Sequence, residues 1–285
     1  MRRILVTGAN GQLGSEIRVL SGEYSADTFF FCSSKELDIC DHSAVHTYIA
    51  INNINTIINC AAYTAVDKAE TEVELAEAIN HHAVANLAKI AAEKNIQMVH
   101  ISTDYVFDGT NHRPYVETEP TNPQSVYGKS KLAGEEAMRI ANPKYSAIIR
   151  TSWVYAHEGN NFVKIMFRLA AERDELNVVA DQMGSPTYAR DLVRVILQII
   201  PQLKNEKVEL LHYSNDGACT WYDFAHFIFE KSGLSIKLNP IATEQYPTPA
   251  KRPFYSVLSK EKIKAKYGVE VKHWERSLSD YLDKQ

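Results

Sequence analysis

The sequence has no marked excess of charge of either sign, because 31 lysines and arginines are set against 35 aspartates and glutamates, a formal net charge of −4. The two signs are interspersed, and there is no basic stripe or polybasic tail. The sequence therefore does not indicate binding to nucleic acid or to an anionic membrane surface. It also contains no apolar run near the length of a transmembrane helix.

Cysteine is scarce. Cys32, Cys40, Cys60 and Cys219 are the only four, and they form no CxxC pair. This spacing indicates neither a disulfide framework nor a zinc site, and it fits free thiols in a reducing cytoplasm. The basic and then apolar start of the chain ends at Thr7 and is too short for the apolar region of a signal peptide. We therefore expect a cytoplasmic protein.

The first half of the 285-residue chain alternates short apolar runs with amphipathic segments. The pattern predicts strands at residues 2–6, 28–32, 56–60, 97–102 and 146–151, and helices at 12–20, 75–94 and 127–140. Such alternation predicts a Rossmann-type, doubly wound parallel sheet over residues 1–155. The less regular residues 156–285 predict a smaller C-terminal substrate-binding lobe, with some segments returning to the sheet.

A glycine-rich turn follows the first predicted strand directly, in the segment TGANGQLG at residues 7–14. Gly8 allows a tight turn, Gly11 lets the backbone approach a pyrophosphate, and Gly14 lets the next helix pack closely on the strand. The N-terminus of that helix would present free N–H groups to the phosphates. The segment predicts a dinucleotide site, although its GxxGxxG spacing differs from the GxGxxG of many dehydrogenases.

The end of the second predicted strand bears on the choice of cofactor. An acid at this position would bind the ribose hydroxyls of NAD, but here Ser33 and Ser34 are followed by Lys35. Small hydroxyls and a cation favour the 2′-phosphate of NADPH, with NADH as the alternative donor. Asp38 lies farther along and either lines the adenine or caps the next helix.

Two further stretches have the residue types of an acid/base site. Tyr127 and Lys131 are four residues apart, so on a helix they share a face about 6 Å apart. A fixed ammonium would lower the pKa of Tyr127 and make it a usable proton donor. Alone, this spacing also fits a surface tyrosine and lysine. Thr103 follows the fourth strand, where open sheets bind ligands, and could hydrogen-bond a reacting oxygen.

Other polar residues give weaker signals. His81 and His82 are adjacent, so on an α-helix they would point about 100° apart, and we predict no metal site there. Residues 181–187 read as a loop. Arg252, in a proline-rich loop, could bind a phosphate bidentately or remain a solvated charge.

Taken together, these segments resemble the extended short-chain dehydrogenase/reductases and, within them, the dTDP-4-dehydrorhamnose reductase family. The resemblance rests on TGANGQLG (7–14), AAYTAVD (61–67), STDYVFDG (102–109), YGKSK (127–131), RTSWVY (150–155), DQMGSPT (181–187) and Arg252-Pro253. These motifs occur in order over nearly the whole chain.

The resemblance implies an NAD(P)H-dependent reductase that acts on the C4 ketone of a dTDP-sugar. Tyr127 would give the proton, Lys131 would bind the nicotinamide ribose, and Thr103 would polarise the carbonyl. The cofactor would be held by Gly8, Gly11, Gln12, Leu13, Gly14, Ser33, Lys35, Asp38, Ile39, Ala61, Ala62, Tyr63, Tyr127 and Lys131. The sugar nucleotide would be bound by Thr64, Val66, Thr103, Asp104, Tyr105, Trp153, Gln182 and Arg252.

The resemblance also allows a homodimer. Some family members hold a magnesium ion between subunits through glutamates, and Glu16 matches one such position, but Arg190 stands at the other. Two alternative functions remain open. One is a related nucleotide-sugar epimerase or 4,6-dehydratase, although the second acid expected after Thr103 in dehydratases is replaced by Tyr105. The other is a non-catalytic subunit that keeps the dinucleotide site, like the regulatory subunit of methionine adenosyltransferase.

Overall fold

Six parallel strands form the central sheet of the structure, a computed structural model that describes residues 1–284. Their order is β10-β5-β4-β3-β1-β2, so the chain reverses its direction of travel across the sheet between β1 and β3. This confirms the predicted Rossmann-type sheet and sets its ligand site at that switch point. The strands are β1 (Arg3–Thr7), β2 (Thr28–Cys32), β3 (Thr56–Asn59), β4 (Gln97–Thr103), β5 (Ala147–Thr151) and β10 (Glu209–His212).

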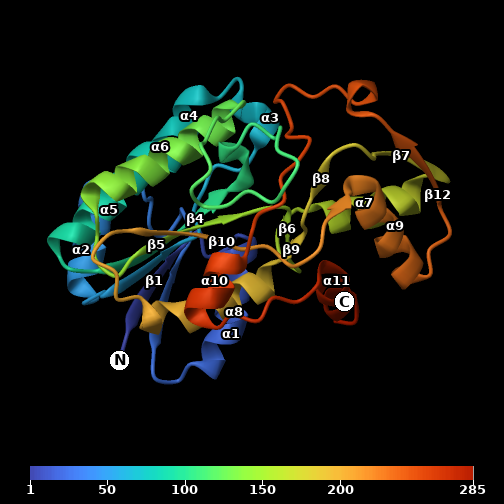
Figure 1. Cartoon of the computed structure of the whole chain (residues 1–285). Coiled ribbons are helices and arrows are strands. Elements are labelled where there is room, and N and C mark those ends of the chain that lie inside the picture. Colours follow the sequence, from blue (N-terminus) through green and yellow to red (C-terminus); the bar gives the residue numbers. More distant parts are fainter. Residues whose placement is uncertain (285) are drawn as a thin grey trace.

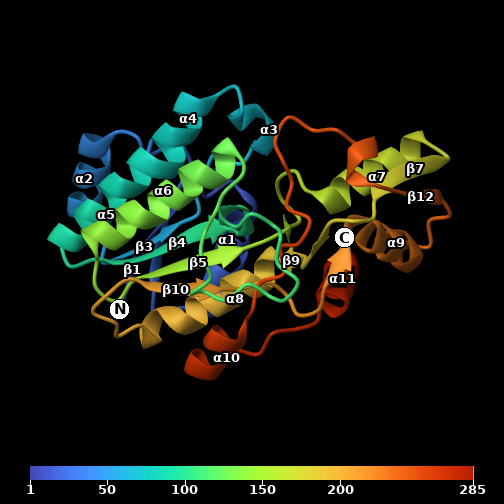
Figure 2. The ribbon, with the colours of Figure 1, turned by 45° about the horizontal axis from the view of Figure 1, so that its top comes forward.

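Helices cover both faces of the sheet (Figures 1 and 2). One face packs its apolar side chains against α2 (His42–Ile51), α5 (Ala83–Glu93) and α6 (Val126–Ala141). The other packs against α1 (Gln12–Leu20), α8 (Ala189–Ile199) and α10 (Glu261–Tyr267). The strands are nearly continuous apolar runs. In β3, for example, the neighbouring residues Ile57 and Ile58 point to opposite faces and both are buried, as a parallel sheet between two layers of helices requires.

Segments from the second half of the chain complete this layer. Strand β10 pairs in parallel with β5 and forms one edge of the sheet, while α8 and α10 supply much of the core below it (Figure 1). Segments from residues 156–285 thus take part in the sheet and its core.

The remaining segments form a lobe beside the carboxyl ends of the strands (Figure 1). It contains α7 (Phe162–Glu172), α9 (Trp221–Ser232) and α11 (Trp274–Leu282) around a core rich in aromatic side chains. Three small sheets accompany them: β7 (Glu175–Val179) with β12 (Lys237–Ile241), β8 (Met183–Gly184) with β11 (Cys219–Thr220), and β6 (Val154–Tyr155) with β9 (Thr187–Tyr188). The lobe is thus held by aromatic packing more than by extended strand pairing.

Two sequence-based expectations are wrong in detail. The predicted single helix at 75–94 consists of α4 (Val73–Glu77), a π-helical turn (Ala78–His82) and α5. The predicted loop at 181–187 contains the short strand β8, and a second short strand, β9, begins at its last residue. In both places tertiary contacts override the local pattern. Asn80 in the π turn bonds to the loop at Tyr63, and the Trp153 carbonyl accepts from the N–H of Thr187.

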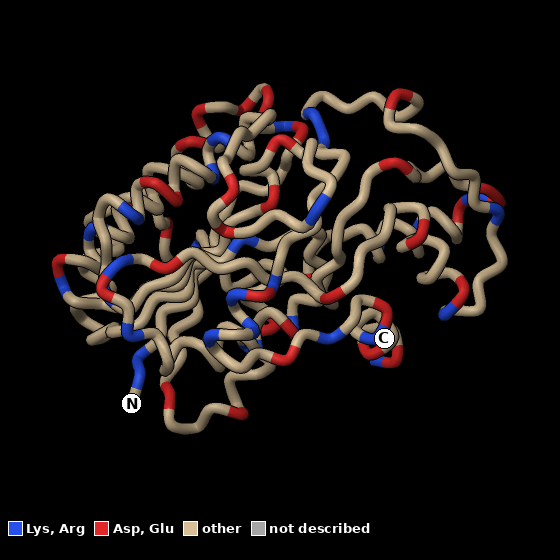
Figure 3. Tube along the Cα trace, viewed as in Figure 1, with Lys and Arg blue, Asp and Glu red and all other residues tan. Residues whose placement is uncertain are grey.

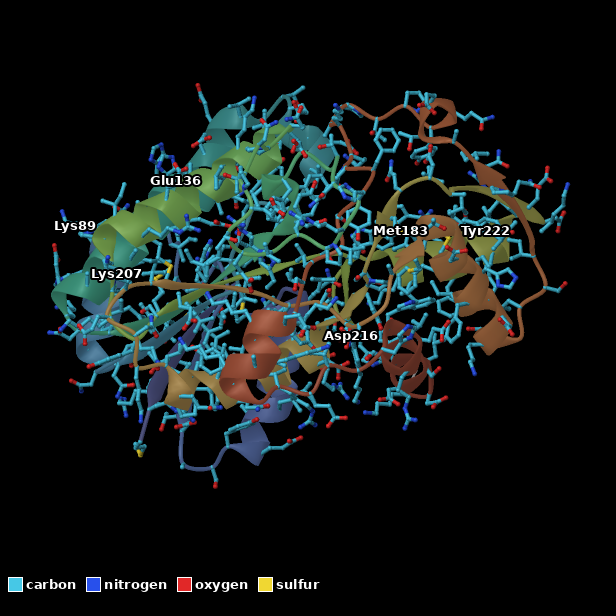
Figure 4. All side chains as sticks on the ribbon, viewed as in Figure 1. Lys89, Glu136, Met183, Lys207, Asp216 and Tyr222 are labelled. Atoms are coloured by element: carbon cyan, nitrogen blue, oxygen red, sulfur yellow. The ribbon has the colours of Figure 1, made fainter. Side chains whose placement is uncertain are left out.

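Charged residues of both signs are spread along the whole trace (Figure 3). Side chains such as Lys89 on α5 and Glu136 on α6 project away from the sheet (Figure 4). Among residues 1–284, no helix is both long and apolar enough to cross a membrane.

Candidate active site

A cleft of about 530 Å³ lies at the carboxyl ends of the strands, between the sheet and the lobe. Twelve of the predicted site residues line it together: Gly11, Gln12, Leu13, Ala62, Thr64, Val66, Thr103, Asp104, Tyr105, Tyr127, Lys131 and Trp153. Segments more than 100 residues apart in the sequence thus meet in one place. A volume of this size suits a ligand of a few hundred daltons.

The glycine turn between β1 and α1 is built as the sequence predicts. Gly8 has φ +64°, and a Cβ there would lie 2.7 Å from the amide nitrogen of Ala61. A Cβ on Gly14 would lie 2.4 Å from the carbonyl oxygen of Gly8. Side chains would therefore force β1, the turn and the segment after β3 apart, and the first N–H groups of α1 would lose their position beside the cleft.

Helix α6 carries Tyr127 into the cleft. The Ser125 hydroxyl accepts from the N–H of Gly128 at 3.1 Å and so caps the helix N-terminus. Gly128 permits a close approach, because a Cβ there would lie 2.3 Å from the carbonyl oxygen of Tyr105. The rings of Tyr105 and Tyr127 then meet edge to face, with centroids 5.5 Å apart. This packing and the nearby Thr103 hydroxyl set the direction of the Tyr127 phenol.

Lys131 lies one turn farther along α6 and is 1% exposed. Its Nζ donates to the carbonyl oxygen of Ile101 at 2.6 Å and lies 3.4 Å from Nε2 of His100. Burial lowers the pKa of Lys131 to about 8, although the Glu135 carboxylate opposes this shift. The ammonium is therefore held against strand β4 at one wall of the cleft.

The expectation that Lys131 lowers the pKa of Tyr127 is wrong for this arrangement. Burial raises the pKa of Tyr127 to about 12, the Thr103 hydroxyl opposes the rise, and the Asp104 carboxylate adds to it. The cause is geometric, because the Lys131 ammonium is directed to the Ile101 carbonyl. In this state Tyr127 is a protonated donor at neutral pH, which is the form that a carbonyl reduction uses.

Thr103 ends β4 and has a carboxylate for a neighbour. Its hydroxyl donates to Oδ1 of Asp104 at 3.0 Å and accepts from the N–H of Tyr105 at 3.2 Å. Asp104 is 2% exposed, and its Oδ2 makes no hydrogen bond of good geometry among the described residues, although the Ser256 hydroxyl lies near enough to affect the carboxyl pKa. Burial raises the pKa of Asp104 to about 6, against the hydrogen bonds from Thr103 and Ser256. The pair thus presents a hydroxyl and an unpaired carboxylate oxygen beside Tyr127.

Farther from the cleft, the end of β2 holds an acid that sequence reasoning missed. The carboxylate of Glu36 turns back and accepts from the backbone N–H of Ser33 at 2.6 Å. The Ser33 hydroxyl and then this backbone N–H lower the pKa of Glu36. Lys35 is exposed beside it. Asp41, whose carboxylate accepts from the N–H of Ala44, caps α2. The alternative role of Asp38 as that cap is therefore wrong.

The lobe side of the cleft is dominated by Trp153. Its backbone is left-handed, with φ +49°, and its indole stacks on Trp221 at 3.5 Å between centroids. A Cβ on Gly184 would lie 2.5 Å from the same indole, so only glycine fits against it. A non-glycine residue held in this conformation indicates a position that the surroundings enforce.

Not every predicted residue reaches the cleft wall. Arg252 pairs with Asp67 at 2.7 Å and donates to the carbonyl oxygen of Ala250 at 3.2 Å. Gln182 is buried and donates to Thr243 at 3.0 Å. The remaining predicted residues outside the lining are Gly8, Gly14, Ser33, Lys35, Asp38, Ile39, Ala61 and Tyr63. Their assigned contacts stay predictions.

Comparison with known proteins identifies the family to which this chain belongs. A sequence model of the RmlD substrate binding domain matches residues 1–285. A dTDP-4-dehydrorhamnose reductase of Aggregatibacter actinomycetemcomitans is 42% identical over 98% of this chain and 98% of that protein. The chain belongs to the dTDP-4-dehydrorhamnose reductase family.

Solved structures agree with this family. A dTDP-4-dehydrorhamnose reductase of Clostridium acetobutylicum superposes with a TM-score of 0.93 at 44% identity, covering 99% of this chain and 98% of that one. The dTDP-4-dehydrorhamnose reductase of Bacillus anthracis, solved in complex with NADP, gives a TM-score of 0.94 at 38% identity over 100% of both chains. The family assignment thus extends over the sheet and the lobe.

Several residues at the site of this family member escaped sequence reasoning. Asn80 in the π turn is fully buried, bonds both backbone groups of Tyr63 and donates to Ser130 on α6 at 3.1 Å. The only signal for it was a polar residue on the apolar face of a helix. Further residues of the cleft lining were not predicted: Cys60, Ile101, Ser102, Thr151, Ser152, Val154, Gly159 and Asn160.

The residues at the position of the family's subunit-bridging magnesium do not fit a cation. Glu16 is buried, and Oε2 of its carboxylate accepts from Nε of Arg190 at 2.7 Å. A guanidinium already neutralises the carboxylate that would have to bind the ion. Elsewhere, the expectation about His81 and His82 is wrong in its geometry, since the π turn stacks their rings at 4.4 Å beside Glu77.

Proposed function

We propose that this chain reduces the C4 ketone of dTDP-4-dehydro-L-rhamnose to dTDP-L-rhamnose with NADPH as the donor, a step in nucleotide-sugar and cell-surface polysaccharide biosynthesis. One observation carries the proposal. The glycine turn at Gly11 and the trio Thr103, Tyr127 and Lys131 line the same cleft. A cofactor and a carbonyl bound there would meet at a protonated phenol.

Each residue would then have one task. The glycine turn and the N-terminus of α1 would bind the pyrophosphate. The nicotinamide supplies a hydride when bound. Tyr127 would give its proton to the C4 oxygen, and the Thr103 hydroxyl would turn from Asp104 to donate to the same oxygen as negative charge develops. Lys131 would bind the nicotinamide ribose with the ammonium protons that the Ile101 carbonyl does not take up.

The sugar nucleotide would occupy the rest of the cleft. Thr64, Val66 and Tyr105 line its dinucleotide-domain side and Trp153 its lobe side. The unpartnered Oδ2 of Asp104 is an acceptor for a sugar hydroxyl. We propose that Gln182 and Arg252 lie at the outer end of the bound sugar nucleotide. Arg252 would have to break its ion pair with Asp67 to reach a phosphate of this ligand.

For the cofactor, two cations favour NADPH. Lys35 lies at the end of β2, and Arg18 of α1 lies close enough to Glu36 to lower the pKa of that carboxyl group further. Glu36 acts in the opposite sense, because a carboxylate repels a 2′-phosphate and binds ribose hydroxyls. We therefore expect NADPH to be preferred without NADH being excluded.

The test is to follow NADPH oxidation with dTDP-4-dehydro-6-deoxy-L-mannose and to identify the product by NMR. Turnover with formation of dTDP-L-rhamnose supports the proposal. Stoichiometric bound NAD with no net NADPH consumption would instead indicate an epimerase or dehydratase. Tight dinucleotide binding without any turnover would indicate the non-catalytic subunit. The cytoplasmic location and a homodimer remain predictions, to be tested by fractionation and by sedimentation.

A further inference from the structure

A row of polar side chains crosses the buried sheet behind Lys131. Thr7 on β1 is in register with Asn59 on β3, and Asn59 is in register with His100 on β4. All three lie on the face covered by α6, and each is no more than 1% exposed. Burying three polar groups among apolar strands is costly unless every donor meets an acceptor.

Hydrogen bonds run along this row in one direction. The hydroxyl of Thr7 donates to Oδ1 of Asn59 at 2.6 Å, and the N–H of Ala61 reaches the same oxygen at 3.3 Å. Since a backbone N–H can only donate, it fixes which end of the amide is the oxygen. The Nδ2 group of Asn59 therefore faces Nδ1 of His100, 3.0 Å away.

This contact determines the tautomer of His100. An amide NH₂ can only donate, so Nδ1 of the ring must carry the lone pair. Burial lowers the pKa of His100 well below its ordinary value, and the Lys131 charge adds to this, so the ring is neutral. A neutral ring with a free Nδ1 carries its proton on Nε2. That Nε2–H faces the amine of Lys131 at 3.4 Å.

We propose that His100 is a positioning residue for Lys131. At Nε2 the His100 ring presents an N–H, so the Lys131 ammonium finds no acceptor on that side. The Ile101 carbonyl, at 2.6 Å, then accepts one proton of the ammonium from the sheet side, and the other two are left for the cleft. The opposite tautomer would place a lone pair at Nε2 and draw a second proton into the sheet.

The row also links two parts of the cofactor site. Thr7 directly precedes Gly8 of the pyrophosphate turn, and Lys131 is the predicted ribose ligand. A chain of hydrogen bonds from Thr7 through Asn59 to His100 thus sets which face of the ring the Lys131 amine meets. The catalytic consequence rests on the proposed function, whereas the tautomer itself does not.

Other titratable groups around this ammonium must be considered in any pH profile. Tyr127 and Glu135 lie on its own helix, Cys60 follows β3, and His100 projects from β4. Arg150 of β5 neutralises Glu135 through a bidentate pair. None of these groups needs to change when the tautomer of His100 is reversed. The carboxylate introduced by Asn59→Asp attracts the ammonium in addition, so His100→Asn, which adds no charge, measures the effect of the ring alone.

Nitrogen-15 NMR of the histidine side chains tests the tautomer without cofactor or substrate. The His100 signals are assigned by their loss in His100→Asn, or by their shift in Asn59→Asp if the first variant does not fold. We expect the Nε2–H tautomer, without titration, from about pH 5 to about pH 9, across the range where ordinary histidines titrate. A ring protonated on Nδ1, or one that titrates in this range, overturns the proposal.

Asn59→Asp reverses the row with almost no change in shape. A carboxylate accepts from Thr7 and Ala61 on one side and from Nδ1–H of His100 on the other, so Nε2 becomes an acceptor for Lys131. The alkaline limb of kcat/KM should then move up by about one pH unit, because the ammonium is better stabilised. His100→Asn removes the facing N–H and should move the limb in the same direction by less.

Thr7→Val is the matched control, because Ala61 still orients the amide of Asn59. It should leave both the tautomer and the alkaline limb in place. If Asn59→Asp changes the tautomer and the limb stays fixed, His100 does not act on Lys131. If the variants only lower the melting temperature with unchanged pH profiles, the row is structural and the proposal fails. If no variant turns over substrate, the NMR result still decides the tautomer while the proposed function fails separately.

Discussion

The two walls of the cleft are built from different interactions. The sheet wall (Thr103, Tyr127 and Lys131) is backed by buried hydrogen bonds and by the ion pair of Glu135 with Arg150. The lobe wall (residues 152–154 and 159–160) is backed by stacked aromatic rings. Buried hydrogen bonds hold a polar atom in one position and orientation. Stacked rings keep a flat face in place but tolerate small sliding movements of one ring over the other. The sheet wall therefore suits proton transfer and the lobe wall suits recognition of a sugar.

The largest effect should come from breaking the ion pair behind the sheet wall. Arg150 binds Glu135 through two hydrogen bonds of 2.8 and 2.7 Å, and both side chains are at most 1% exposed. Arg150→Met leaves the buried carboxylate with only the Ser102 hydroxyl and the more exposed Arg139, and should lower the free energy of unfolding by up to about 3–5 kcal/mol. Urea unfolding measures this loss. The double variant with Glu135→Leu should recover most of it, and no recovery would show that the pair is not the cause.

Next in size is the loss of the proton donor. Tyr127→Phe should reduce kcat by about 10²-fold or more, because no other described hydroxyl on α6 lines the cleft. The dissociation constant for NADPH, measured by fluorescence titration, should change little. Turnover close to that of the unmodified chain would refute the role of Tyr127.

The carboxylate beside Thr103 should govern the acidic side of the pH profile. With its pKa raised to about 6, Asp104 takes up a proton as the pH falls below that value, and the neutral group is then a weaker acceptor for Thr103 and for a sugar hydroxyl. We expect kcat/KM to fall about tenfold for each pH unit well below about pH 6, as for loss of one essential ionised group. Asp104→Asn should be less active at pH 7 but should not show this fall in kcat/KM at acidic pH. If the fall is unchanged in the variant, another group is responsible for it.

A smaller effect is expected on the lobe wall. Trp221→Leu removes the ring on which Trp153 stacks and should raise KM for the sugar nucleotide by up to about tenfold, since such stacking contributes about 0.5–1.5 kcal/mol. The value of kcat should fall less than KM rises. Trp221→Phe keeps an aromatic face and should recover most of the affinity. Equal loss in both variants would point to disruption of the lobe core instead.

The smallest effect concerns cofactor choice at the end of β2. Glu36→Gln removes a negative charge near the expected 2′-phosphate and should raise the preference for NADPH over NADH by up to about fivefold, because solvent and salt screen the effect of an exposed charge. Lys35→Ala should shift the preference in the opposite direction. Comparing kcat/KM for the two cofactors measures both. A clear preference for NADH in the unmodified chain would overturn the choice of NADPH.

Much of the sheet wall could be predicted because its signals are local. Apolar runs and glycines defined β1 to β5 to within a residue or two, and the Tyr127 helix begins at Val126, one residue before the predicted start. The pKa of Tyr127 could not be predicted, because the direction of the Lys131 amine depends on the carbonyl of Ile101 in another element. The row behind it depends on the register of three strands, which spacing along the chain does not encode.

The lobe wall was harder for a different reason. Trp153 could be named from its motif, but its stacking partner Trp221 is 68 positions later, and the Thr220–Asp223 capping box that begins its helix does not reveal which ring Trp221 meets. The π turn at Asn80 and the return of Glu36 to the backbone of Ser33 are likewise set by single side-chain bonds. Such bonds form only after the elements have packed.

The position of β10 at the edge of the sheet has a consequence for biosynthesis. While residues 1–155 leave the ribosome, β5 is an open edge and the face of the sheet below α1 lacks α8 and α10, which come much later in the chain. Closure must wait for residues 209–212, so the slowest contacts to form are those of greatest sequence separation. In that interval an exposed parallel edge is the surface most prone to wrong pairing with another nascent chain.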